Sequence, residues 1–260
     1  MGQYYSAIIL KPDYMNEEQP VEMAIYPHDF GNGAKMMEHC YVGNNFVAQA
    51  CRFLGGKYYG YPFVWCGDYA DGLITNKTTN MMVRLYRRDE GSEKNPLGIA
   101  LKKTFGDKVF DQMLENWIEL PYDEKMFNEL NESEGFYVKA GIKVYKIAVD
   151  LIKQDKFPRK PTREKSVFKY ILNLDTNEYV KIPRFSPKYG TFHPLPLLCS
   201  AGNGMGCGDY DVTYSIKGSD EDEIEDCIGI WAYNRIGVSD KIPNGFKELK
   251  INFGVNKFMW

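Results

Sequence analysis

The sequence lacks the features that would assign it at once to a membrane, secreted or nucleic-acid-binding class. No apolar run approaches the ~18 residues that a membrane-spanning helix needs, so we expect no membrane partner. The N-terminus has no basic stretch leading into an apolar core, so we expect no secretory signal and a cytoplasmic location. The net charge of −3 gives no overall positive field for holding nucleic acid, and no strong nucleic-acid signal is present.

Cysteine motifs are absent as well. The six cysteines form no Cys-x-x-Cys pair of the kind that binds zinc. A chain of 260 residues does not need disulfides to fold, so we expect reduced and mostly buried thiols. No feature of the sequence activates a thiol, so nothing favours Cys66 or Cys207 as a nucleophile paired with a histidine.

What is present favours an α+β fold. With 44% hydrophobic and 26% charged residues, the composition is that of a globular protein, and the length suits one large domain over residues 1–260. Residues 4–10 and 21–26 predict a hairpin, and residues 168–182 predict a second one. Because strands outnumber helices and follow one another through hairpins, we predict an α+β domain with mainly antiparallel sheet and a few helices packed on one side.

Helix signals are fewer. Asn44 or Asn45 is expected to cap a helix that ends at a glycine pair. Apolar residues share one face over 107–119, which predicts a second helix. The acidic stretch 120–135 is expected to be a loop, and residues 136–150 alternate in the manner of a long strand.

Three segments concentrate residue types that carry chemistry or permit unusual backbone. We refer to residues 27–39 as block 1, residues 65–71 as block 2 and residues 193–211 as block 3. The chain has only three histidines, and all of them lie in blocks 1 and 3. Imidazole titrates near neutral pH and binds metals, so this placement marks the blocks as candidates for a functional site.

The glycines of block 3, at positions 202, 204, 206 and 208, match neither the dinucleotide-binding fingerprint nor the phosphate-binding loop. Such a tract either forms a bulged loop that serves only the fold, or lets backbone amides approach a ligand closely. The residues that we expect to contact a ligand come from all three blocks: Gly31, Asn32, Tyr69, Asp71, Gly202, Asn203, Gly204, Gly206 and Tyr210.

Histidines and short acids of the blocks could supply a mixed metal site or general acid and base groups. Two histidines and a carboxylate would suit zinc, manganese or iron, but no His-x-x-x-His pair fixes a geometry, so the metal and any cofactor stay unknown. The alternative is a structural role in turns, helix caps and a satisfied polar core. The candidate catalytic residues are His28, Asp29, Asp68, His193 and Asp209.

Two stretches are strongly charged. Residues 153–169 are basic and residues 220–226 are acidic. Like charges packed this closely repel each other and stay hydrated, which favours solvated loops. The functional alternatives are a strip facing a phosphate for the first stretch and a partner contact for the second.

The opening Met-Gly-Gln-Tyr-Tyr and the motifs His-Asp-Phe-Gly-Asn-Gly, Gly-Asp-Tyr-Ala-Asp, His-Pro-Leu-Pro-Leu-Leu and Gly-Asn-Gly-x-Gly-x-Gly-Asp-Tyr resemble a family of proteins found in Gram-positive and gut bacteria and their phages. The resemblance covers residues 1–71 and 168–252, and its weakness over 89–165 implies a variable or inserted segment there. It implies a cytoplasmic protein of phage or prophage type, and by analogy with other small phage proteins we expect it to act against a host defence system. It carries over no catalytic residue.

Three functions are consistent with these observations. The first is binding of a small-molecule ligand, with a nucleotide as the favoured class, because glycine backbone, tyrosines and basic residues suit phosphate and base recognition. The second is a metal-dependent hydrolase that uses the His/Asp cluster. The third is an inhibitor that binds a host protein through the acidic stretch. Whichever applies, we expect the three blocks to converge on one cleft, because each follows or lies between predicted strands.

Overall fold

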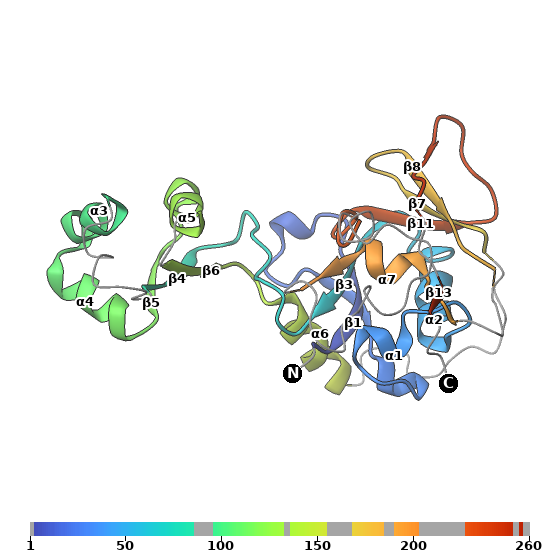
Figure 1. The fold of residues 1–260 in the computed structure, drawn as a ribbon, viewed down its shortest axis with the longest axis horizontal. Helices are drawn as coiled ribbons and strands as arrows, with labels where there is room; N and C mark the ends of the chain where they lie inside the picture. Colours follow the sequence, from blue (N-terminus) through green and yellow to red (C-terminus); the bar gives the residue numbers. More distant parts are fainter. Residues whose placement is uncertain are drawn as a thin grey trace. The chain divides into compact units, whose positions relative to one another are not determined.

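The computed structural model describes residues 3–85, 96–132, 136–154, 168–184, 190–202, 227–251 and 255–256. The chain divides into two compact units (Figure 1). Unit 1 comprises Met1–Ala70 and Val144–Trp260, and unit 2 comprises Asp71–Lys143. Unit 2 therefore begins and ends earlier than the inserted segment that the sequence placed at 89–165.

An eight-stranded sheet forms the centre of unit 1, in the order β12-β8-β7-β11-β3-β1-β2, with β10 also paired to β3. Its neighbours are antiparallel except for β10 with β3 and β12 with β8, so the predicted α+β class with mainly antiparallel sheet is confirmed. The strands are β1 (Tyr5–Leu10), β2 (Val21–Ile25), β3 (Tyr61–Gly67), β7 (Tyr170–Asn173), β8 (Glu178–Lys181), β10 (Ser200–Ala201), β11 (Arg235–Ser239) and β12 (Lys247–Glu248). A separate pair joins β9 (Gly190–Thr191) to β13 (Val255–Asn256).

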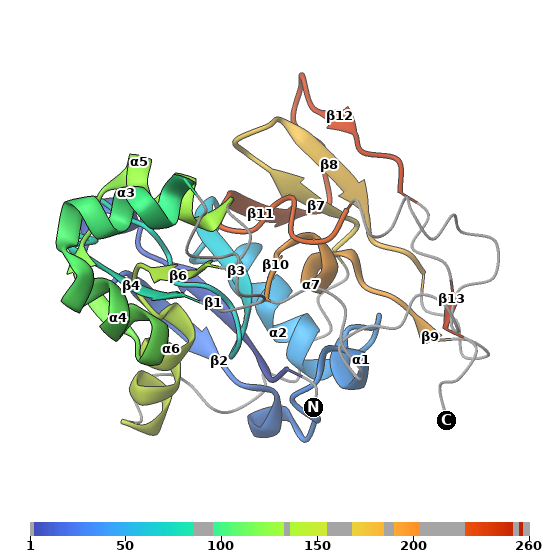
Figure 2. The same cartoon turned by 60° about the vertical axis from the view of Figure 1, so that its left-hand side comes forward.

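Every residue of β1 is buried, so both faces of the sheet are covered there. Tyr5, Ala7 and Ile9 point into the main core, together with residues of α1 (Met36–His39), α2 (Asn45–Leu54) and α7 (Pro194–Leu198). Residues alternate along a strand, so Ser6, Ile8 and Leu10 face the other way. The helix α6 (Val144–Lys153) packs against β1, β2 and β3 and covers that second face (Figure 2).

The local signals for α2 and for the hairpins are confirmed. The Asn44 side chain accepts hydrogen bonds from the backbone N–H groups of Phe46 and Val47, which otherwise lack partners in the first turn of a helix. The predicted hairpin of β1 and β2 is present, although a 3₁₀ turn, η1 (Tyr14–Asn16), lies in its connection. The hairpin of β7 and β8 turns at Asn177, whose φ of 55° is left-handed.

Unit 2 has its own sheet and core. The three-stranded sheet has the order β5-β4-β6, with β4 (Asn80–Leu85), β5 (Ile118–Pro121) and β6 (Phe136–Ala140) all antiparallel. Residues of α3 (Pro96–Phe105), α4 (Asp107–Glu115) and α5 (Glu124–Asn131) fill the core against one face of it. A bridge between Leu73 and Ile142 brings the entering and leaving segments together, with N–H to O distances of 2.9 and 2.8 Å.

Three sequence predictions in this part of the chain need correction. The stretch 120–135 is no loop, since it contains part of β5 and all of α5, which Asp123 caps by accepting from the Met126 N–H. The helix expected over 107–119 ends at Glu115, because β5 follows at once. The strand expected over 136–150 ends at Ala140. Gly141 then takes a φ of 96°, which turns the chain out of the strand, and α6 begins.

We predict that Gly141→Ala destabilises unit 2 more than Gly106→Ala does. Both glycines have left-handed φ values, of 96° and 83°, so alanine is strained at either position by about 1 kcal/mol. A Cβ at Gly106 meets no atom, whereas a Cβ at Gly141 overlaps the backbone of Leu73 and Gly72. Overpacking of this kind costs about 1–3 kcal/mol more.

Hydrogen exchange of β4 and β6 amides, compared in the two variants, measures this difference. Equal protection in both variants would show that the close contact between the entering and leaving segments contributes nothing to the stability of unit 2.

Candidate functional site

Three strands of unit 1 end at the same end of its sheet, and each leads into one of the sequence blocks. β2 and β3 both run antiparallel to β1, and β10 runs parallel to β3, so the three strands share one direction. Block 1 follows β2, block 2 includes the end of β3, and the glycine tract of block 3 follows β10. The topology therefore brings the start of this tract beside block 2 and the beginning of block 1, at the end of the sheet where β1 begins.

Asp68 is anchored at this end by the first residues of the chain. Its Oδ1 accepts the Tyr4 N–H at 3.0 Å, and its own N–H donates to the Tyr4 carbonyl at 3.0 Å. Among the described residues, no hydrogen bond reaches its second carboxylate oxygen. Tyr4, which makes both of these bonds with Asp68, is 48% exposed, and Tyr69, the next residue in the chain, is 45% exposed. Asp68 is therefore a carboxylate held by the backbone of one exposed tyrosine and followed in the chain by another.

Gln3 lies between two glycines of different blocks. The register of β10 on β3 pairs Ser200 with Trp65 and Ala201 with Cys66, so Gly202 comes next to Gly67. A Cβ added to either glycine would overlap the Gln3 side chain. A larger residue at either position would require the end of the Gln3 side chain to move.

The α6 side of the same end holds a cluster of aromatic and polar groups. The Tyr145 hydroxyl hydrogen-bonds to Tyr26, and Asp68 and Cys66 lie close enough to interact with it electrostatically. Burial, the bond to Tyr26 and the nearby Asp68 all raise the pKa of Tyr145, so it stays a neutral donor. The ring of His28 meets the ring of Tyr26 edge-on, with centroids 5.1 Å apart.

Block 1 makes a turn whose predicted site residues have local structural partners. The 3₁₀ turn η2 (Pro27–Phe30) closes at Gly31, which has a φ of 72°, and Asp29 lies in its first turn. His28 is exposed and its Nδ1 donates to the Asn32 carbonyl at 3.0 Å. The Asn32 side chain accepts from Asn44 at 2.7 Å, which ties the turn to the cap of α2.

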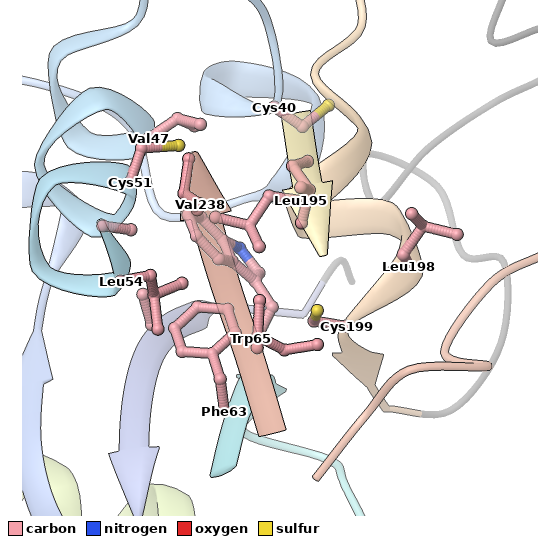
Figure 3. Close-up of a cluster of buried hydrophobic side chains, with 14 of the residues drawn as sticks. Cys40, Val47, Cys51, Leu54, Phe63, Trp65, Leu195, Leu198, Cys199 and Val238 are labelled. Carbon is pink, nitrogen blue, oxygen red and sulfur yellow. The ribbon is translucent and has the colours of Figure 1, made fainter. Parts of the chain in front are cut away.

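His193 does not lie at this end of the sheet. It is 5% exposed and caps α7, because its Nδ1 accepts the Leu195 N–H at 3.2 Å. Its Nε2 lies 3.6 Å from the sulfur of Cys51 on α2. These helices cover the sheet face opposite to α6, and Figure 3 shows Cys51 and Leu195 packed around Trp65.

The contact of Cys51 with His193 was missed by sequence reasoning, which considered only Cys66 and Cys207. It resembles a nucleophile and base pair, but the hydrogen bonds exclude that role in this arrangement. Because Nδ1 accepts a backbone N–H, the single proton of the neutral ring sits on Nε2, which then cannot take a proton from the thiol. Burial raises the pKa of Cys51 to about 12 and lowers that of His193 to about 3, so both groups are neutral.

The third histidine, His39, is fully buried and has both ring nitrogens occupied. Its Nε2 accepts the Trp65 indole N–H at 3.0 Å, and its Nδ1 donates to the Gly33 carbonyl at 3.0 Å. Burial lowers its pKa to about 4. It therefore belongs to the core.

The remaining predicted site residues are divided. Asp71 is exposed and is the first residue of unit 2. The structure does not describe Asn203, Gly204, Gly206, Asp209 and Tyr210, nor the acidic stretch 220–226. Within the described ranges, no group of three His, Cys, Asp or Glu side chains could hold a metal ion, and no helix is long and apolar enough to cross a membrane.

Comparisons of the chain with protein-family models, curated proteins and solved structures gave no match.

We predict that acid destabilises unit 1 through the two buried histidines. Their pKa values lie below the ordinary 6.5 in the folded state, so between pH 6.5 and their folded values the unfolded chain binds more protons. The unfolding free energy is therefore highest above pH 6.5. At pH values below 6.5, the unfolding free energy decreases by about 1.4 kcal/mol per pH unit for each histidine.

His193→Asn keeps an acceptor for the Leu195 N–H but cannot titrate. Urea unfolding of both proteins at several pH values from neutral down to about pH 4.5 should give a shallower pH dependence for the variant, by one proton. Parallel curves would contradict the assignment of a neutral, buried His193.

Proposed function

We propose that the protein binds a nucleotide at the end of the unit 1 sheet where Tyr4, Asp68 and Tyr69 lie. The observation that supports this most is an anchored carboxylate whose bonded neighbour Tyr4 and whose chain neighbour Tyr69 are both exposed. Exposed aromatic rings stack on nucleobases, and a carboxylate oxygen accepts hydrogen bonds from sugar hydroxyls or base amino groups. In the phage context that the sequence resemblance implies, such a protein would sequester a nucleotide used by a host defence system.

The glycine tract that follows Gly202 is the proposed source of phosphate contacts. Gly202 already lies beside Gly67, one residue before Asp68, so the tract starts next to the proposed site. Backbone N–H groups of glycine-rich segments bind phosphates without needing a cationic side chain. This arrangement would permit anion binding by a chain whose net charge is −3.

The two other functions have less support from the described residues. A hydrolase would need a cluster of metal ligands, but His193 is used as a helix cap and His39 as an acceptor for Trp65. A protein inhibitor would bind its partner through the acidic stretch 220–226, which lies outside the described residues.

We predict that at least one nucleotide in a panel of mono-, di- and cyclic nucleotides stabilises the protein against heat. Ligand at about 100 times its dissociation constant should contribute about 2.7 kcal/mol. Tyr69→Ala should weaken this stabilisation, because it removes a stacking surface worth about 1–3 kcal/mol. Tyr59→Ala is the matched control, since Tyr59 is 43% exposed and precedes β3, whereas Tyr69 follows it.

Nucleotide binding is measured by thermal shift and confirmed by calorimetry. The proposal fails if no nucleotide stabilises the protein at millimolar concentration, or if Tyr59→Ala weakens binding as much as Tyr69→Ala does. If no nucleotide stabilises the protein, metal analysis of the purified protein tests the hydrolase alternative.

A further inference from the structure

The sheet of unit 2 has two faces of opposite character. Met81, Val83 and Leu85 of β4 are buried under the helices of the unit. The residues between and before them face the other way, because side chains alternate along a strand. Of these, Asn80 and Arg84 are exposed and Met82 is partly exposed, so this second face, which we call the outer face, is open to solvent.

Aromatic and basic side chains share one part of the outer face. Arg84 pairs with Tyr137 of β6, which is 53% exposed. On the other side of β4, the register of Val83 with Ile118 continues to Trp117, which comes opposite Arg84. The two rings therefore lie on either side of Arg84, two strand spacings or about 10 Å apart.

A second cation lies beside this row. Lys139 is exposed, pairs with Met82 in the register of β6 on β4, and places its Nζ 5.5 Å from the centre of the Trp117 ring. On the same face, the Asn80 side chain donates a hydrogen bond to one carboxylate oxygen of Glu119. That oxygen is therefore already partnered. Among the described residues, the outer face thus carries one exposed ring, one partly buried ring and two exposed cations, together with one hydrogen-bonded carboxylate.

We propose that the outer face binds single-stranded nucleic acid. Bases that are not paired can stack on aromatic side chains of a sheet, and cations between the rings take the phosphates that join those bases. The alternation of ring, cation and ring across three strands has this pattern. It is independent of the nucleotide site proposed for unit 1. The net charge of −3 provides no general attraction, so affinity must come from these local groups.

Fluorescence anisotropy with short labelled single-stranded DNA and RNA, using the full-length protein, tests the proposal. Tyr137→Ala should weaken binding by about tenfold, because it removes one stacking surface. The double variant Arg84→Gln/Lys139→Gln should lower the dependence of log affinity on log salt by ~1.4, since each phosphate contact contributes ~0.7. All three residues are exposed, so the variants should fold as the wild type does.

Two matched controls separate this face from the rest of the chain. Lys108→Gln removes an exposed cation from α4, on the covered side of the sheet, and should change neither affinity nor salt dependence. Tyr59→Ala should leave oligonucleotide binding unchanged, because Tyr59 is an exposed ring of unit 1 that lies outside both proposed sites. The proposal is overturned if no oligonucleotide binds at about 50 mM salt, where phosphate contacts are strongest. It is equally overturned if the control variants weaken binding as much as Tyr137→Ala.

Discussion

The arrangement of unit 1 depends on the burial of the Trp65 indole. A buried N–H without an acceptor costs about 1–3 kcal/mol. His39 removes that cost, because its Nε2 accepts the Trp65 indole N–H at 3.0 Å. This bond fixes the proton of His39 on Nδ1, which donates to Gly33 and so holds block 1 against the core. On either side of Trp65, β3 pairs with Ala7 of β1 and Ser200 of β10. One buried side chain thus links the strands and the loop that form the candidate site.

The use of histidine in the core changes where chemistry can occur. Only three histidines are present in 260 residues, and two of them are neutral, buried and fully hydrogen-bonded or packed. A scarce residue that titrates near neutral pH predicts catalysis when it is exposed, but here burial lowers the pKa of His39 and His193 so that they act as acceptors. In the proposed site, recognition is therefore assigned to tyrosines and Asp68.

Local signals in the sequence predicted local structure well. The cap at Asn44 and the hairpin of residues 168–182 were found because their determinants lie within a few residues of each other. The break at Gly141 was missed because the composition does not change there. The alternating pattern of β6 is followed directly by the apolar spacing of α6, and the two together resemble one long strand. The burial of His193 could not be predicted either. Its partner Cys51 is 142 positions away, and only the fold brings α2 and α7 together.

The two proposed surfaces should differ in how they recognise an anion. Charge attraction falls with salt in proportion to the number of phosphate contacts made by cations, whereas ring stacking and backbone N–H groups depend on it much less. The residues of the site proposed in unit 1 are tyrosines, Asp68 and glycines, so a ligand bound there would be recognised mainly by stacking and hydrogen bonding. Those of the surface proposed in unit 2 include Arg84 and Lys139, so binding there would weaken as salt rises. If both proposals hold, a chain of nearly balanced charge binds two anionic ligands, because the recognition at each surface is set by the few residues placed on it rather than by the net charge.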